Sequence, residues 1–235
     1  MLTIDKVSVY GFEESIRGMR NPMNSWDKSD SGYSNIPRID AMIDETELHV
    51  EPADHVYFLG YNDTTLMNKL VKAGPSHRKF MRMIVVYMDI CAPLYWWKEF
   101  DTYKIGTVAN SCSTMHKIQA KEFKLSDFST EHLTDDFALS NAENPLDVME
   151  HTVHCLNFCR SLYLETRDKK YWWQMIQLLP SSYNQKRTVM LNYEVLSRMY
   201  HARIKHKLDE WRDFCKWIEQ LPYSELITEI ESEDK

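Results

Sequence analysis

The chain contains 235 residues, enough for one well-buried core or two small ones, and its net charge is −7. An acidic chain has no electrostatic basis for wrapping duplex nucleic acid, and no run of about 18 apolar residues offers a membrane span. A hydrophobic fraction of 43%, with 7 Trp and 13 Tyr, predicts a folded globular protein. None of the 5 cysteines forms a Cys-x-x-Cys pair and the start lacks a signal-peptide layout, so we expect reduced thiols and a cytoplasmic location.

The first half of the chain predicts mixed elements. Residues 1–10 alternate apolar and polar side chains, as in a strand. The other segments predicted here are a helix at 13–20, a polar loop excursion at 24–60 with strand pieces around 47–50 and 56–58, a helix capped by Thr64 or Thr65 and ended by Gly74, a strand at 83–91, and an irregular polar segment at 92–116.

The second half is predicted to be helical. The expected segments are a broken acidic surface stretch at 126–144, helices at 145–164, 169–179 and 184–220, and a frayed acidic tail at 225–235. The order of elements favours a single α+β domain over residues 1–235.

The polar segment at 92–116 gathers hydroxyl and amide side chains that suit a polar ligand. Within it Cys112 lies in the sequence NSCST, four residues before His116. A nearby imidazole favours a thiolate, so Cys112 is a candidate nucleophile; the alternative is an inert, packed thiol.

Two further patterns have both a functional and a structural interpretation. His151, His154, Cys155 and Cys159 share a face of one predicted helix, but ligands from one straight helix rarely complete a zinc tetrahedron. We interpret that face as packing and expect no metal. The basic run at 200–207 is either a solvated helix face or an anion pocket.

Within residues 66–112, Ala92-Pro93 ends the predicted strand and KEFDTYKIGTVANSCSTM follows without a gap. This stretch resembles the flavin-dependent thymidylate synthases, which show a strand ending in Ala-Pro and then RQw.RHRxxSxNExSxRY. Further on, MIQLLP, LNYEVL and RIKHKLDEWR resemble the family's AR..LP, vNaRsL and R…HAQwEIR. The likeness covers about two thirds of the chain.

The resemblance implies a twisted, mainly antiparallel sheet flanked by long helices, the fold of thymidylate-synthase-complementing proteins. It also implies reductive methylation of dUMP to dTMP with FAD, NADPH and methylene-tetrahydrofolate, in a homotetramer with active sites between subunits. The partners expected are therefore a pyrimidine deoxynucleotide and further copies of the chain.

The resemblance also assigns site residues. They are Lys98, Glu99, Ser113 and Arg203 for the substrate, and Lys104, Thr107, Asn192 and His206 for the cofactor. Cys112 falls where the family carries serine, and its thiol is our own candidate for the catalytic residue, since the family is thought to use no cysteine nucleophile.

Departures from the family motif favour two alternatives. Ile176 and Glu194 replace arginines of the family, and only Lys98 and Lys104 keep a positive charge in the first motif. Lysine lacks the two-pronged fork with which arginine binds a phosphate. The alternatives are an inactive relic that binds a nucleotide or a protein, and a pyrimidine-modifying transferase on the same scaffold.

Overall fold

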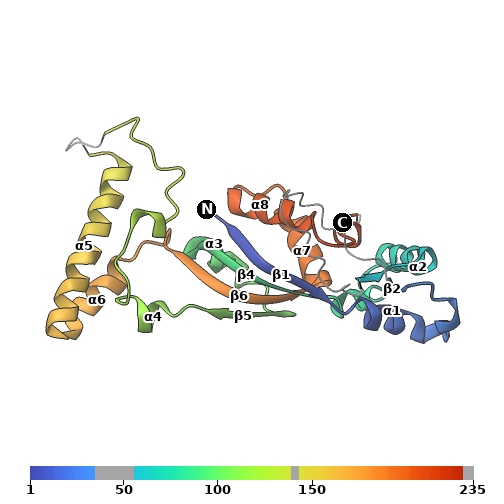
Figure 1. Ribbon diagram of the computed structural model, residues 1–235. Coiled ribbons are helices and arrows are strands. Elements are labelled where there is room, and N and C mark those ends of the chain that lie inside the picture. Colours follow the sequence, from blue (N-terminus) through green and yellow to red (C-terminus); the bar gives the residue numbers. More distant parts are fainter. Residues whose placement is uncertain (35–55, 139–142, 230–235) are drawn as a thin grey trace, which may run out of the picture. The chain divides into compact units, whose positions relative to one another are not determined.

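The computed structural model describes residues 1–34, 56–138 and 143–229 (Figure 1). Its strands are β1 (Thr3–Tyr10), β2 (Gly32–Ser34), β3 (Val56–Phe58), β4 (Val85–Pro93), β5 (Thr107–Ser111) and β6 (Asn184–Asn192). Its helices are α1 (Phe12–Arg20), α2 (Tyr61–Lys72), α3 (Leu94–Phe100), α4 (Thr114–Lys117), α5 (Pro145–Thr166), α6 (Lys169–Leu178), α7 (Tyr193–Arg203), α8 (Asp209–Ile218) and α9 (Glu225–Thr228). No helix among the described residues is both long and apolar enough to span a membrane.

The main sheet has the strand order β1-β4-β6-β5, and β2 pairs with β3 in a separate antiparallel ribbon. Strands β5 and β6 run antiparallel, with Thr107 opposite Leu191 and Ser111 opposite Arg187. The predicted α+β class, a mainly antiparallel sheet with flanking helices, is confirmed.

The described residues group into two compact units. Unit 1 contains residues 1–8, 87–191 and 202–218, and unit 2 contains the described residues of 9–86, 192–201 and 219–229. The chain therefore passes between the units several times. A single domain stays a prediction, and each unit is described by itself below.

Unit 1 has an aromatic core beside the sheet. Alternate residues of β4, such as Met88 and Ile90, are buried, so one face of the strand belongs to the core. Trp96 and Trp97 of α3 are buried as well, and the Trp96 ring lies 4.8 Å from that of Trp211. From sequence, the aromatic run at 95–97 is a candidate surface for contact between copies of the chain; this expectation is wrong for both tryptophans, which are buried.

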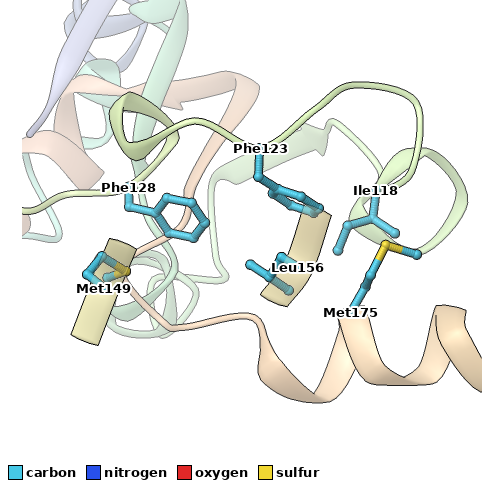
Figure 2. Close-up of a cluster of buried hydrophobic side chains, with 6 residues drawn as sticks. All are labelled: Ile118, Phe123, Phe128, Met149, Leu156 and Met175. Carbon is cyan, nitrogen blue, oxygen red and sulfur yellow. The ribbon is translucent and has the colours of Figure 1, made fainter. Parts of the chain in front are cut away.

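A second hydrophobic cluster of unit 1 joins α5 and α6 to the segment after β5 (Figure 2). Its buried members are Ile118, Phe123, Phe128, Met149, Leu156 and Met175. Helix α5 begins as predicted, with Asn144 accepting hydrogen bonds from the backbone N–H groups of Leu146 and Asp147. Ile176 packs against this cluster.

Buried ion pairs stabilise unit 2. Arg20 at the end of α1 donates to Asp63 of α2, and Arg78 donates to Glu194 of α7 at 3.0 Å. All four side chains are at most 11% exposed. The family position held by Glu194 is therefore part of an internal salt bridge here.

Several predicted boundaries are wrong. Residues 184–220 do not form one helix, because 184–192 pair as β6, with Val189 and Leu191 facing the core, before α7 and α8 follow. Residues 92–116 are not irregular, since they form α3, β5 and α4. Helix α2 begins at Tyr61, where Gly60 is its N-cap, rather than at a threonine cap.

Two expectations lie partly outside the described residues. In the excursion at 24–60, the strand piece at 56–58 is confirmed as β3, whereas the piece at 47–50 falls outside the description. In the tail at 225–235, the residues 225–228 form α9 rather than a frayed end, and 230–235 fall outside.

Candidate functional site

Glu99 and Arg203 form the centre of a polar cluster in unit 1. Glu99 lies on α3 and Arg203 is the last residue of α7. The Arg203 Nη1 donates to Glu99 Oε2 at 2.6 Å, and its Nε donates to the Tyr103 hydroxyl at 3.0 Å. The Arg203 side chain is 19% exposed and that of Glu99 is 35% exposed, so a ligand can reach both.

Trp211 and His206 lie at the same carboxylate oxygen. Trp211 of α8 donates its indole N–H to Glu99 Oε2 at 3.0 Å, and His206 Nε2 lies 3.3 Å from that atom. The other ring nitrogen of His206 accepts from the backbone N–H of Leu208, which assigns the proton of a neutral ring to Nε2. We name these five residues, Glu99, Tyr103, Arg203, His206 and Trp211, the Glu99 cluster.

The Glu99 cluster is electrically balanced. The Glu99 carboxylate offsets the charge of Arg203, whose guanidinium also lies 4.7 Å from the centre of the Trp211 ring. Arg203 therefore keeps less attraction for a phosphate than an unpaired arginine has. The two hydrogen bonds and the His206 contact all involve Oε2, so within the described residues Glu99 Oε1 remains an acceptor for a ligand N–H.

A small hollow lies directly beside the cluster. Its volume is about 190 Å³, and Tyr103, Lys104 and Thr107 are among its lining residues. The Thr107 hydroxyl is buried and has no hydrogen-bond partner among the described residues. A buried hydroxyl without a partner is costly, so a ligand atom that hydrogen-bonds to Thr107 is a physically reasonable occupant.

Cys112 lines a larger cavity of unit 1, about 420 Å³ in volume. The thiol is exposed, and three lysines, Lys117, Lys121 and Lys186, line the same cavity. Two hydrogen bonds fix the backbone of Cys112: its N–H donates to the backbone carbonyl of Lys186, and its carbonyl accepts from the side-chain amide of Gln185.

A second thiol, Cys91 of β4, also lines this cavity. Burial raises the pKa of the Cys91 thiol, which keeps it protonated at neutral pH. Burial likewise raises the pKa of Tyr183, another lining residue. The exposed Cys112 is therefore the cavity thiol that a substrate can reach.

The structure brings only some of the predicted site residues together. Glu99, Arg203 and His206 are in direct contact, whereas Lys104 and Thr107 share the small hollow. Ser113 lines the Cys112 cavity, but its hydroxyl caps α4 by accepting from the His116 N–H.

The remaining predicted residues have other surroundings. Lys98 is exposed on α3. Asn192 belongs to unit 2, where its side chain accepts from the Val195 N–H at the start of α7. Lys104, a candidate activator of Cys112, lines the small hollow rather than the Cys112 cavity, and His116 is exposed.

The cysteine–histidine face of α5 and the basic run also have defined places. His151 and Cys155 are exposed on α5, and the described residues contain no group of three or more His, Cys, Asp or Glu that could hold a metal. Arg203 and His206 of the basic run join the Glu99 cluster rather than forming a solvated face.

Sequence reasoning missed two members of the Glu99 cluster. Tyr103 and Trp211 contact Arg203 through a hydroxyl and a ring face. Trp211 has the spacing of a core residue on a helix, and it is fully buried, so the periodicity masks the role of its indole N–H. Tyr103 carried a usable signal, since it lies at the family's Arg-His-Arg.

Comparisons with known proteins place the fold. The chain is similar to the crystal structure of thymidylate synthase X from Helicobacter pylori with FAD and dUMP, with a TM-score of 0.63 and 16% identity, covering 97% of this chain and 98% of the other. A second structure of the flavin-dependent enzyme from that organism, complexed with FAD and dUMP, gives the same score and identity over 96% and 99%. No protein-family model and no curated protein matches the chain.

Proposed function

We propose that the protein is a flavin-dependent enzyme that reductively methylates a pyrimidine deoxynucleotide, with dUMP as substrate. The observation that supports this most is the likeness of fold over nearly the whole chain to enzymes whose structures contain FAD and dUMP. The reaction is of the thymidylate synthase type and uses NADPH and methylene-tetrahydrofolate as co-substrates. The working form is a cytoplasmic homo-oligomer, with the tetramer as our first expectation.

The proposed substrate contacts follow from the Glu99 cluster. A uracil ring carries an N–H donor between two carbonyl acceptors. Glu99 Oε1 can accept from that N–H, and Arg203 can donate to an oxygen of the nucleotide. Trp211 holds Glu99 in place through its indole N–H, and the His206 ring lies beside the same oxygen. Lys98, at the exposed surface, is proposed to attract the phosphate, and Ser113 lines the cavity of Cys112.

The residues present offer a partial fit to FAD. The unpartnered Thr107 hydroxyl and the Lys104 ammonium in the small hollow suit a phosphate or a ring edge. Asn192, which belongs to unit 2, is proposed as a cofactor contact on the motif alone. A hollow of about 190 Å³ accommodates a part of the cofactor, not the whole. When bound, the reduced flavin would supply the hydride for the reaction.

Purification provides the first test. We expect a yellow protein that releases FAD on denaturation, binds dUMP in calorimetry, and forms dTMP when given NADPH and methylene-tetrahydrofolate. A Thr107→Val variant, which keeps the shape but removes the hydroxyl, should bind FAD about tenfold more weakly. A colourless protein that ignores both added FAD and dUMP would contradict the proposal.

A second candidate is a non-catalytic relic that binds a nucleotide or a protein partner. The observation that favours it is the structural use of positions where the family carries arginine. Ile176 packs in the α5–α6 cluster, and Glu194 pairs with Arg78. Binding of dUMP without FAD and without turnover would select this candidate. Turnover of dUMP with another carbon donor would select the pyrimidine-modifying transferase.

Cys112 is proposed as the nucleophile of the reaction. Its cavity shares no lining residue with the small hollow beside the Glu99 cluster, so attack on a pyrimidine held by that cluster requires Cys112 of another copy in the proposed oligomer. Its thiolate would bond to C6 of the pyrimidine, and C5 would attack the methylene carbon of the folate, whose C–N bond breaks as the C5 proton leaves. The hydride that reduced flavin would supply then completes the methyl group, and the C6–S bond breaks to release the thiolate. We expect 5-fluoro-dUMP with the folate to form an adduct on Cys112, detected by mass spectrometry, and both Cys112→Ser and Cys112→Ala to lose it.

The matched control for this test is Cys155→Ala, which removes an exposed thiol on α5. That variant should keep the adduct. If turnover survives both Cys112 variants and no adduct maps to Cys112 in the parent protein, the nucleophile assignment is wrong and Cys112 is only a wall of the cavity.

A further inference from the structure

Unit 2 contains a cavity whose walls are aromatic and acidic. Its volume is about 550 Å³. The aromatic rings that line it are Tyr10, Phe12, Tyr33, Tyr57 and Tyr223. Its charged lining residues are Glu13 and Glu14, in the first turn of α1, and no basic side chain is among the described residues that line it. None of these lining residues belongs to the Glu99 cluster, which is part of unit 1.

Contacts between the lining residues fix these walls. The Tyr33 hydroxyl of β2 donates to Glu13 Oε2 at 2.8 Å, and the Tyr33 ring lies 5.0 Å from that of Tyr57 on β3. Among the other lining residues, the Phe12 ring lies 5.3 Å from that of Tyr223. The rings therefore come from α1, from the β2–β3 ribbon and from the segment before α9, and they are held by one another.

The acidic side chains affect the electrostatics of the cavity. Burial, reinforced by the negative charge of Glu13, raises the pKa of Tyr57 to about 12. The hydrogen bond to Glu13 raises the pKa of Tyr33 as well. Burial is the larger cause for Tyr57 and the hydrogen bond for Tyr33, and the charges of Glu13 and Glu14 add to both shifts. The two carboxylates are the groups of the cavity that attract a cation.

A simpler role explains only part of the arrangement. Glutamates in the first turn stabilise a helix by interacting with its dipole, and Glu13 and Glu14 do so on α1. That role requires neither an adjoining cavity nor aromatic walls supplied by β2, β3 and the C-terminal segment. Aromatic rings combined with carboxylates are the combination that binds alkylated ammonium groups, through the ring faces and through charge.

We propose that this cavity binds an organic cation, an alkylated ammonium group, held by the aromatic walls and by Glu13 and Glu14. The site is independent of the proposed enzymatic function and does not require flavin or nucleotide. The cation is either a free quaternary amine or the side chain of a methylated lysine in a peptide, since both present the same group.

Choline and its neutral isostere 3,3-dimethylbutanol provide the test, because they differ in charge and hardly in shape. Calorimetry on the full chain should show choline binding at least about tenfold more tightly than the alcohol. The double variant Glu13→Gln/Glu14→Gln should lose about tenfold in choline affinity, while Glu165→Gln, an exposed glutamate on α5, should not.

Glu14→Gln alone serves as a second variant, since it leaves the Tyr33–Glu13 hydrogen bond in place, and thermal melting checks that each protein is folded. A peptide containing trimethyl-lysine distinguishes the sources: binding of the peptide but not of choline assigns a protein side chain. Equal binding of choline and the alcohol together with no binding of the peptide, or unchanged choline affinity in the folded double variant, would overturn the proposal.

Discussion

Asp63→Ala is expected to lower the free energy of unfolding by about 3–5 kcal/mol, the range for breaking a buried charge pair. The Asp63 side chain is fully buried and that of Arg20 is 4% exposed. Oδ1 accepts from Arg20 at 2.6 Å. Oδ2 accepts from both serine hydroxyls of Ser29 and Ser31, and from the backbone N–H groups of Asp30 and Ser31. Alanine would leave the Arg20 charge and the loop donors without their common acceptor.

Urea denaturation followed by circular dichroism measures the loss. Asp27→Ala, which removes an exposed carboxylate from the same stretch of unit 2, is the control and should change the stability by less than about 0.5 kcal/mol. A loss below about 1 kcal/mol in Asp63→Ala would show that the loop at 25–31 does not depend on this pair.

The pH dependence gives an independent check on the same residue. Burial raises the pKa of Asp63, but hydrogen bonds from Ser29, Ser31 and Arg20 outweigh it, so the net pKa is lowered. A lowered folded-state pKa adds stability above the unfolded-state pKa of about 3.9, and this stability is lost as the pH falls through the folded-state value. The stability difference between the parent and Asp63→Asn should therefore shrink as the pH falls below about 4.

Long-range pairing is what sequence reasoning could not find here. Arg20 and Asp63 are 43 residues apart, and Arg78 and Glu194 are 116 apart, so no local pattern connects them. The start of α5 was predictable because its signals are local: Asn144 as the cap, with a proline directly after it.

Strand β6 shows the opposite case. Residues 184–192 alternate as a strand does, but the buried Gln185 obscures the pattern, and the apolar residues at 189–199 also fit a helical period. The segment becomes a strand because it lies between β4 and β5, where its backbone pairs with a neighbouring strand on both sides. The sequence pattern within 184–192 does not show which strands lie on either side of it.

Part of the candidate site was also predictable from sequence, and part was not. Glu99, Arg203 and His206 were predictable because a family motif marks their positions, and the structure places them in contact. The motif did not indicate that Glu99 is already bonded to Arg203, because in the family the position of Glu99 is a glutamine, which carries no charge to offset an arginine. The change from glutamine to glutamate alters the electrostatics of the site more than its shape.

Arg203→Ala is expected to weaken dUMP binding by about 2–4 kcal/mol if the proposed substrate contacts hold. Arg203 is the only guanidinium in the Glu99 cluster as the structure describes it, and alanine would remove its bonds to Glu99 and Tyr103 together with any bond to the nucleotide. Calorimetry measures the affinity, and Arg198→Ala, an exposed arginine of α7, is the matched control that should bind as the parent does.

Glu99→Gln tests what the carboxylate does to Arg203. The amide keeps an oxygen that accepts from Arg203, but it removes the negative charge, so more of the positive charge of Arg203 becomes available to a phosphate. The amide then turns its NH2 group, a donor, toward the base N–H in place of Oε1. We therefore expect Glu99→Gln to bind deoxyuridine, which lacks the phosphate, more weakly than the parent does, and to prefer dUMP over deoxyuridine about tenfold more strongly. Unchanged dUMP affinity in folded Arg203→Ala would show that Arg203 does not contact the nucleotide. Tighter binding of deoxyuridine and dUMP alike in Glu99→Gln would mean that the carboxylate opposes the pyrimidine itself, and the assignment of Glu99 Oε1 to the base N–H would then be wrong.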